Sequence, residues 1–345
     1  MNKSRLALFF DGTWNDPEDQ TNVYRSAKLL QDFDGSIEQR FFYNAGVGTD
    51  KWNKILGGAT GYGLSENLLE GYEWLARRYQ SNDEIWIFGF SRGAYTARSL
   101  VGLIRKCGLL EITTDSLLNR ASKLYRDKSR APSHADCLEF RSTYSQEVRI
   151  HFIGVWDTVG ALGIPGTSFS EKGKFSWHDT ELSSIVDNAY HAMAIDEYRA
   201  AYDVAMWTSK DGKQKAGNSN VEQRWFIGAH ANVGGGYGKD QLADIALHWM
   251  IDKAKKHGLA IREIELDEDS WQEKIVDSYR QFMFGLYKAF RKVFKRGDGR
   301  HVRIYERLAD NRIGVNVSID PSVHKRISDT TIKYDPPTIK MIKEN

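Results

Sequence analysis

The chain has 345 residues, of which 41% are hydrophobic and 27% charged, which is the composition of an ordinary globular protein. Its formal net charge is only +2, so no strong overall field attracts nucleic acid, and nucleic-acid binding is not expected. No run approaches the roughly 18 apolar residues of a membrane span, and the early run LALFF is too short for a signal-peptide core. We therefore expect a protein made in the cytoplasm without a signal peptide.

Cys107 and Cys137 are the only cysteines, and neither has a C-x-x-C partner or the spacing of metal ligands. We expect both to be free thiols in a reducing compartment, and we expect no metal and no cofactor. Ten tryptophans, 16 tyrosines and 16 phenylalanines are many for this length. They indicate either an apolar cleft or simply an aromatic-rich core.

Short apolar runs that end in polar or glycine-containing turns predict the strands of a parallel sheet. They lie at residues 6–10, 40–44, 84–90, 148–156 and 222–229. Helix-like patterns lie between or after them, at residues 65–80, 92–107, 183–206 and 241–257. This alternation predicts an α/β fold with a mostly parallel sheet flanked by helices. We expect a single domain over residues 1–345, with helical insertions at about 111–145 and 258–330.

Ser91 lies in the sequence Gly-Phe-Ser-Arg-Gly, between the predicted strand 84–90 and the predicted helix 92–107. A G-x-S-x-G sequence at a strand-to-helix turn is typical of a nucleophile elbow, in which a strained turn exposes the serine hydroxyl. The alternative is a glycine-flanked turn whose serine only caps the helix. We favour the nucleophile.

Asp157 and His230 each follow a predicted strand directly, in GVWDTVG and GAHANVGGGYG. The order serine, acid, histidine is that of the α/β hydrolases. We therefore predict that Ser91 is the nucleophile, His230 the general base and then acid, and Asp157 the carboxylate that orients it. The alternatives are that Asp157 caps a turn and that His230 is an ordinary interior histidine.

Other acids and histidines are weaker candidates. Asp196, Asp203 and Asp240 do not come directly after a strand-like run. His151 lies within a predicted strand, so we expect a structural role. His191 has helical surroundings, and we favour packing or support over a place in the cleft.

The backbone N–H of Arg92 is the first predicted donor to an oxyanion, because it follows the nucleophile at a helix start. The second donor is expected from the loop after the first strand, at Gly12 or Thr13. An ordinary turn is the alternative there. We expect Asp11 to order this loop rather than to act in catalysis. The glycine-rich segment 57–63 lacks the ending of a P-loop, so it predicts a rim of the cleft rather than a nucleotide site.

Five segments together resemble the catalytic domain of a bacterial α/β-hydrolase family, long of unknown function, that includes type VI secretion phospholipase effectors. They are LALFFDGTWN, GFSRGAYTARSL, GVWDTVG, HAMAIDEYR and FIGAHANVGGGYG. The resemblance implies a serine hydrolase acting on phospholipid acyl esters at the A1 or A2 position, with the triad already named.

The resemblance also implies a phospholipid or membrane surface as partner, together with a secretion-system component or an immunity or regulatory protein. Export by a type VI system, or action at a membrane surface, follows from it. The secreted effectors commonly carry additional membrane-anchoring regions, whereas this chain looks like little more than the catalytic module. A domestic or defence lipase is therefore an alternative to a secreted toxin.

Two other functions remain open at this point. One is an esterase, thioesterase or peptidase with the same mechanism on another acyl substrate. The other is a catalytically silent hydrolase fold used for binding. A basic amphipathic pattern over residues 271–296 also predicts a helix, which either lies on an anionic bilayer or packs on the core.

Overall fold

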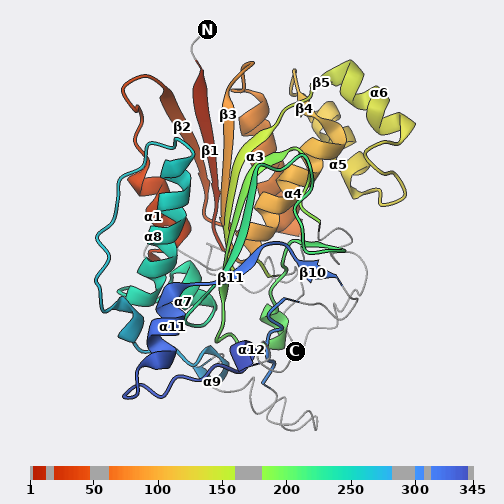
Figure 1. Ribbon diagram of the computed structural model, residues 1–345. Helices are drawn as coiled ribbons and strands as arrows, with labels where there is room; N and C mark the ends of the chain where they lie inside the picture. The colour runs from red at the N-terminus through yellow and green to blue at the C-terminus, as the bar shows by residue number, and fades with distance from the viewer. Residues whose placement is uncertain are drawn as a thin grey trace.

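A seven-stranded parallel sheet forms the centre of the protein (Figure 1). The computed structural model describes residues 3–12, 19–46, 62–159, 181–281, 300–306 and 312–340. The strands are β1 (Ser4–Phe10), β2 (Glu38–Asn44), β3 (Glu84–Phe90), β6 (Ile150–Trp156), β7 (Val186–Ala194), β9 (Asn220–Phe226) and β11 (Val317–Ile319). Their order in the sheet is β11-β9-β7-β6-β3-β1-β2, and every neighbouring pair is parallel.

Helices cover both faces of the sheet, as expected when parallel strands are connected by crossovers. One face carries α1 (Asn22–Leu29) and α8 (Gln241–Lys256), and the other carries α3 (Tyr62–Ala76) and α4 (Arg92–Cys107) (Figure 1). The other helices are α5 (Asp115–Arg126), α6 (Ala135–Tyr144), α7 (His230–Gly234), α9 (Ser278–Gln281), α11 (Pro321–Ser328) and α12 (Pro337–Lys340). The described residues also contain short elements. These are the 3-10 turns η2 (Ala200–Tyr202) and η3 (Ser270–Gln272), and the strands β4 (Leu109–Leu110), β5 (Ser145–Gln146), β8 (Thr208–Ser209) and β10 (Ile313–Gly314).

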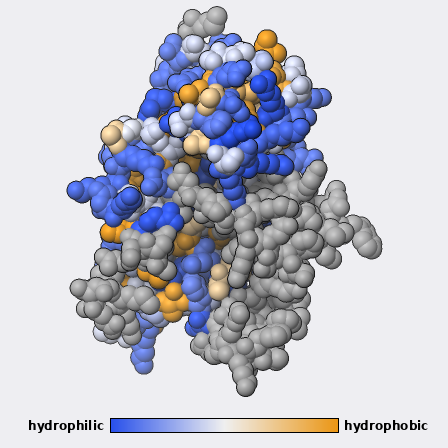
Figure 2. Space-filling model, turned by 90° about the vertical axis from the view of Figure 1, so that its right-hand side faces the viewer, coloured by the Kyte–Doolittle hydropathy of each residue, from blue (hydrophilic) through white to orange (hydrophobic). Residues whose placement is uncertain are grey.

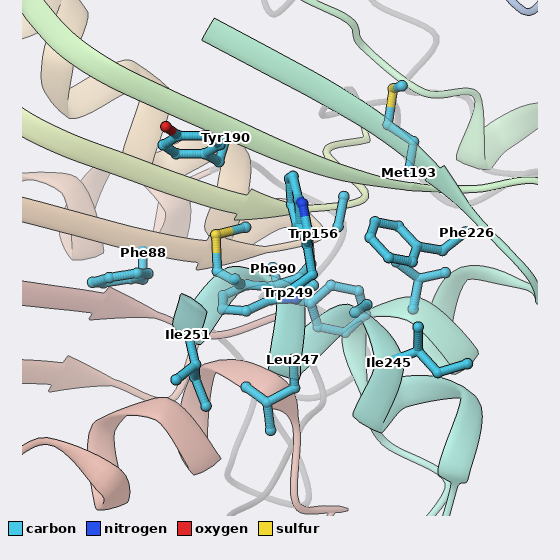
Figure 3. Packing of buried hydrophobic residues seen from close by; sticks show 14 of the residues in the cluster. Phe88, Phe90, Trp156, Tyr190, Met193, Phe226, Ile245, Leu247, Trp249 and Ile251 are labelled. Carbon is cyan, nitrogen blue, oxygen red and sulfur yellow. The ribbon is translucent and has the colours of Figure 1, made fainter. Parts of the chain in front are cut away.

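The alternation of side chains along the strands divides the core into two layers. In β3, Trp86, Phe88 and Phe90 point into the layer beneath α1 and α8, whereas Ile85 and Ile87 point into the layer beneath α3 and α4. Figure 3 shows the first layer, in which aromatic rings from the strands pack against the apolar side chains of α8. In β1, β3 and β6 both faces are buried, which explains why these strands read as continuous apolar runs in the sequence.

The structure agrees with the predicted strands and with most of the predicted helices, and one helix is wrong. Residues 183–206 were expected to be helical, but Val186–Ala194 form strand β7, paired with β6 and β9. His191 therefore lies in a central strand and not in a helix. The segment VDNAYHAMA is buried on both faces, so it lacks the polar alternation that marks a half-exposed strand, and its alanines favour a helix by propensity.

The C-terminal part of the chain also differs from expectation. The segment 258–330 was expected to be an insertion, but it contributes β11 to the edge of the central sheet. A continuous helix over 271–296 is wrong at its start, since η3 ends at Gln272 and α9 begins only at Ser278. Residues 282–296 lie outside the described residues. Within the described part of the chain, no helix combines the length and hydrophobicity needed to span a bilayer.

On the face drawn in Figure 2, the coloured residues are mostly hydrophilic, and hydrophobic side chains lie among them in small groups. Among the described residues, the exposed large hydrophobic side chains are Phe33, Phe41, Ile112, Leu138, Tyr237 and Ile304. Scattered exposed side chains of this kind are normal for a globular protein and carry no functional conclusion by themselves.

Replacing Phe88 by alanine should lower the free energy of unfolding by about 3–5 kcal/mol, because a fully buried ring leaves a cavity that its neighbours fill only in part. Phe88 is 1% exposed and its ring stacks on Phe9 with 4.9 Å between centroids. Phe33→Ala is the matched control, since that ring is 57% exposed and its loss should change stability by less than about 0.5 kcal/mol. Urea unfolding measures both, and equal effects would contradict the assignment of the core.

Candidate active site

The carboxyl ends of the central strands bring three polar side chains together. Ser91 follows β3, Asp157 follows β6, and His230 lies just beyond β9. The chain runs from β1 outward to β2 and then returns to β3 on the other side of β1. Such a reversal of strand order opens a crevice at the carboxyl edge of a parallel sheet, where ligands commonly bind.

Ser91 occupies a strained turn between β3 and α4. Its backbone has φ 57° and ψ −122°, a conformation that residues with a Cβ rarely adopt. A backbone hydrogen bond from Ser91 N–H to the carbonyl of Trp156, at 3.1 Å, ties the turn to the end of β6. The Ser91 side chain makes no capping hydrogen bond to α4, so the capping alternative does not describe this turn.

Glycines allow the close approaches that this turn requires. A Cβ at Gly89 would lie 2.6 Å from the carbonyl oxygen of Gly93, and a Cβ at Gly93 would lie 2.1 Å from that of Phe10. A Cβ at Gly234 would lie only 1.9 Å from the ring of Phe90. The first two glycines let α4 start directly against β3 and β1, and the third lets α7 reach the same place.

A continuous chain of hydrogen bonds joins the three polar side chains. The Oγ atom of Ser91 lies 2.8 Å from Nε2 of His230, and Nδ1 of His230 lies 2.6 Å from Oδ2 of Asp157. Since an ionised carboxylate only accepts hydrogen bonds, Nδ1 carries a proton and donates to Asp157. Nε2 of the neutral ring then accepts from the Ser91 hydroxyl. Ser91 and His230 are each 6% exposed, and Asp157 is completely buried.

Two aromatic rings hold the His230 imidazole in place. The Phe90 ring lies at a centroid distance of 4.6 Å, and the Tyr202 ring meets it edge-on at 5.0 Å. Burial lowers the pKa of His230, and the hydrogen bond and charge of Asp157 oppose that effect only in part. The imidazole is therefore neutral at neutral pH.

Asp157 accepts hydrogen bonds at both oxygens. Oδ1 accepts from the backbone N–H of Ala194 at 2.9 Å and from Nη1 of Arg303 at 2.6 Å. Oδ2 accepts from His230 and from Nη2 of Arg303 at 3.0 Å. Burial alone would raise the pKa of Asp157, but the charges and hydrogen bonds of Arg303 and His230 hold it below its usual range. Asp157 is therefore ionised.

Sequence reasoning missed two charged residues at this site. Arg303 contacts Asp157 across 146 residues of sequence, so no local pattern reveals it. Glu197 is fully buried and accepts hydrogen bonds from the Arg199 side chain and, at 3.3 Å, from the backbone N–H of His230. The only available signal for Glu197 was its position in DEYR, shortly after a buried run.

The two candidate oxyanion donors differ in their position relative to Ser91. Arg92 is the first residue of α4 and adjoins Ser91, as predicted from the sequence. The N–H of Gly12 donates to Oδ1 of Asp11 at 2.7 Å, so in this structure it is directed at that carboxylate. Thr13 lies outside the described residues. Asp11 also accepts from Thr21 Oγ1 at 2.5 Å and from Tyr43 Oη at 2.9 Å, which fits a role in ordering the loop.

The acids and histidines that were weaker candidates for the triad have other partners. Asp196 accepts from the N–H of Gly228 and from Tyr334, Asp203 pairs with His301, and Asp240 caps α8. His151 lies within hydrogen-bonding distance of the carbonyl of His257 at the other end of β6.

Burial lowers the pKa of His191 to about 3, and this neutral ring accepts a hydrogen bond from the N–H of Thr158 at 3.1 Å. His191 therefore supports the turn that carries Asp157. Within the residues that the structure describes, no three histidine, cysteine or acidic side chains form a metal-binding group.

Replacing Gly93 by alanine should lower the free energy of unfolding by about 1–3 kcal/mol or more, because the added methyl group would overlap two backbone carbonyls. Gly102→Ala, in the same helix, is the matched control. A methyl group there meets only the end of the Tyr125 side chain at 3.2 Å, and alanine favours the helix by about 1 kcal/mol. Urea unfolding compares the two variants, and a Gly93→Ala protein as stable as Gly102→Ala would contradict the close contact between α4 and β1.

Comparisons with known proteins identify the family of this chain. Residues 4–253 match the family described as "T6SS, Phospholipase effector Tle1-like, catalytic domain". An uncharacterized protein of Saccharomyces cerevisiae is 28% identical over 230 residues, which cover 59% of this chain and 32% of the yeast protein. The chain thus matches about a third of the length of that relative.

Two solved structures are also similar to parts of the chain. An uncharacterized protein from Pseudomonas aeruginosa has a TM-score of 0.46 and 19% identity, covering 86% of this chain and 51% of the other. The Tle1 effector bound to the VgrG spike of the type VI secretion system has a TM-score of 0.36 and 19% identity, covering 68% and 51%. The family match alone spans well over half of the 345 residues, and the chain therefore belongs to this family of Tle1-like phospholipase effector catalytic domains.

Proposed function

We propose that this chain is a serine hydrolase that cleaves the acyl ester bonds of phospholipids through an acyl-enzyme intermediate. The observation that carries the proposal is the hydrogen-bond chain from Asp157 through His230 to Ser91, with Ser91 on a strained turn at the carboxyl edge of the sheet. Nucleophile, base and orienting acid in this relation are the parts that acyl transfer requires. The membership of the family of phospholipase effectors supports the substrate class.

In the first step, Ser91 Oγ attacks the ester carbonyl while its proton moves to Nε2 of His230. The lowered pKa of His230 favours this role, since the ring is neutral and able to accept a proton at neutral pH. Asp157 keeps the proton of Nδ1 in place and stabilises the positive charge that develops on the ring. His230 then gives its proton to the departing alcohol, which leaves the acyl group on Ser91.

In the second step, a water molecule repeats the sequence on the acyl-enzyme. His230 takes a proton from the water, the hydroxide attacks the carbonyl, and Ser91 leaves with the proton returned by His230. The backbone N–H of Arg92 is the proposed donor to the oxyanion in both steps, because it follows the nucleophile at the first residue of α4. Gly12 or Thr13 is proposed to supply the second donor, and for Gly12 this requires its N–H to turn away from Asp11.

The substrate proposal extends to a lipid surface and a delivery partner. A phospholipase must extract its substrate from a bilayer, so a membrane surface is a proposed partner. Delivery by a type VI secretion system, with one of its components as a protein partner, follows from the family description. The mechanism applies equally to the A1 and the A2 ester, since both are acyl esters of the same glycerol.

Replacing Ser91 by alanine should reduce fatty-acid release from phosphatidylethanolamine–phosphatidylglycerol vesicles by about a million-fold, which is the order of loss when a serine hydrolase loses its nucleophile. Ser99→Ala is the matched control, because Ser99 lies about two turns further along the same helix, beside Tyr95 and Tyr125. A fluorophosphonate probe should label the wild type and Ser99→Ala, but not Ser91→Ala.

Three results would count against parts of this proposal. Vesicle hydrolysis by Ser91→Ala would remove Ser91 from the mechanism. Absence of labelling in folded wild-type protein would favour a silent binding module. Hydrolysis of short soluble esters without any release from vesicles would move the substrate to another acyl class.

The pH dependence of kcat/KM should report the neutral form of His230. Protonated imidazole cannot accept the Ser91 proton, so the rate should fall on the acid side. Because the pKa of His230 is lowered, the midpoint of that fall should lie below the ordinary histidine value of about 6.5, and the rate should be on its plateau at pH 7. Stopped assays with a soluble ester at constant ionic strength measure the profile. A midpoint above pH 7 would contradict a neutral base in the resting enzyme.

A further inference from the structure

Arg303 is a fully buried cation that reaches the site from beyond the family-matched residues. The match ends at residue 253, whereas Arg303 lies in the short described segment 300–306. Both the Arg303 and the Asp157 side chains are 0% exposed. A buried arginine is costly unless it is paired, so its position here calls for a specific partner.

That partner is the carboxylate of Asp157, to which Arg303 donates hydrogen bonds from two nitrogen atoms. Nη1 lies 2.6 Å from Oδ1 and Nη2 lies 3.0 Å from Oδ2. The same two nitrogens also donate to the backbone carbonyls of Ala194, at 2.7 Å, and of Tyr202. The guanidinium thus faces Asp157 with Nη1 and Nη2, and its Nε donor has no hydrogen-bond partner among the described residues.

We propose that Arg303 is a positioning residue for the proposed hydrolysis, which holds Asp157 ionised and in the orientation that directs Oδ2 at His230. This inference rests on the proposed function, because it concerns the acid of the same site. Arg303 does not touch the reacting atoms. It acts through Asp157, and through Tyr202, whose ring packs against His230.

Loss of Arg303 would affect both the orientation and the ionisation of Asp157. Without Arg303, Oδ1 keeps only the hydrogen bond from the N–H of Ala194, and Oδ2 only the one from His230. Two hydrogen bonds then hold the carboxylate in place of four, so the orientation of Oδ2 toward Nδ1 of His230 is restrained less firmly. The missing positive charge also favours protonation of a carboxylate that has no contact with water.

A purely structural role is the competing explanation, because Arg303 also joins β7 and η2 through the two carbonyls. The two roles differ in the pH profile. Removing a positive charge beside Asp157 and His230 raises the pKa of both groups, so the acid fall of kcat/KM should move to higher pH. Loss of packing alone reduces the amount of active enzyme and leaves the midpoint unchanged.

The test compares Arg303→Met and Arg303→Lys with the wild type, using a soluble ester substrate. Arg303→Met should lower kcat by about 100-fold with little change in KM, the size of loss that a displacement of about 1 Å in a catalytic group produces. Its acid midpoint should shift to higher pH. Arg303→Lys keeps the charge but not the fork, so its midpoint should stay near that of the wild type and its kcat should lie between the two. Added guanidinium ion should restore part of the activity of Arg303→Met.

Arg141→Met is the matched control. Arg141 is a buried arginine of α6 that donates to the carbonyls of Lys106 and Pro132, in the group of short elements at the opposite end of the sheet (Figure 1). It should change the free energy of unfolding without moving the acid midpoint. If Arg303→Met does not fold, Arg303→Lys decides. A kcat equal to that of the wild type, or a clear shift of its acid midpoint to higher pH, would then overturn the proposal.

Two further outcomes would also overturn it. One is wild-type kcat in both Arg303 variants, and the other is a lowered kcat with an unmoved midpoint in Arg303→Met. Fluorophosphonate labelling of the wild type separates these results from a failure of the proposed function. If Ser91 is labelled and the Arg303 variants behave normally, only the role of Arg303 falls.

Discussion

A negative charge buried at the end of β6 governs the arrangement of this site. Asp157 has no exposed surface, and an isolated carboxylate in such a place would cost far more free energy than a protein can lose. Its neighbours are accordingly all donors: a backbone N–H at the end of β7, the guanidinium of Arg303 and the imidazole of His230. Satisfying this one group fixes the ends of two strands, the C-terminal segment and the histidine relative to one another.

Ser91 is held by a different constraint, which is the close contact of its backbone turn with neighbouring backbone. Ser91 keeps an unfavourable φ because α4 begins directly against β3 and β1, and glycines leave the space for this contact. The strain is balanced by the surrounding core, in which the aromatic residues of β3 and β6 pack beneath α8 (Figure 3). A rigid sheet thus carries the serine, while side chains from later segments complete its surroundings.

The sequence predicts much of this, for reasons that can be traced to particular residues. Ser91, Asp157 and His230 each follow an apolar run at once, and parallel strands place such positions at a common edge, so their meeting is foreseeable. The segment 186–194 could not be assigned in this way, because burial on both faces removes its alternation. Arg303 could not be found at all, since its partner is 146 residues away and nothing near it in the chain differs from an ordinary basic residue.

The position of β11 and Arg303 so late in the chain has a consequence for biosynthesis. A nascent polypeptide that has emerged only as far as residue 253 leaves β9 as a bare edge strand and Asp157 without its counter-charge. The sheet edge and the site are therefore complete only when β11 and the segment that carries Arg303 have docked.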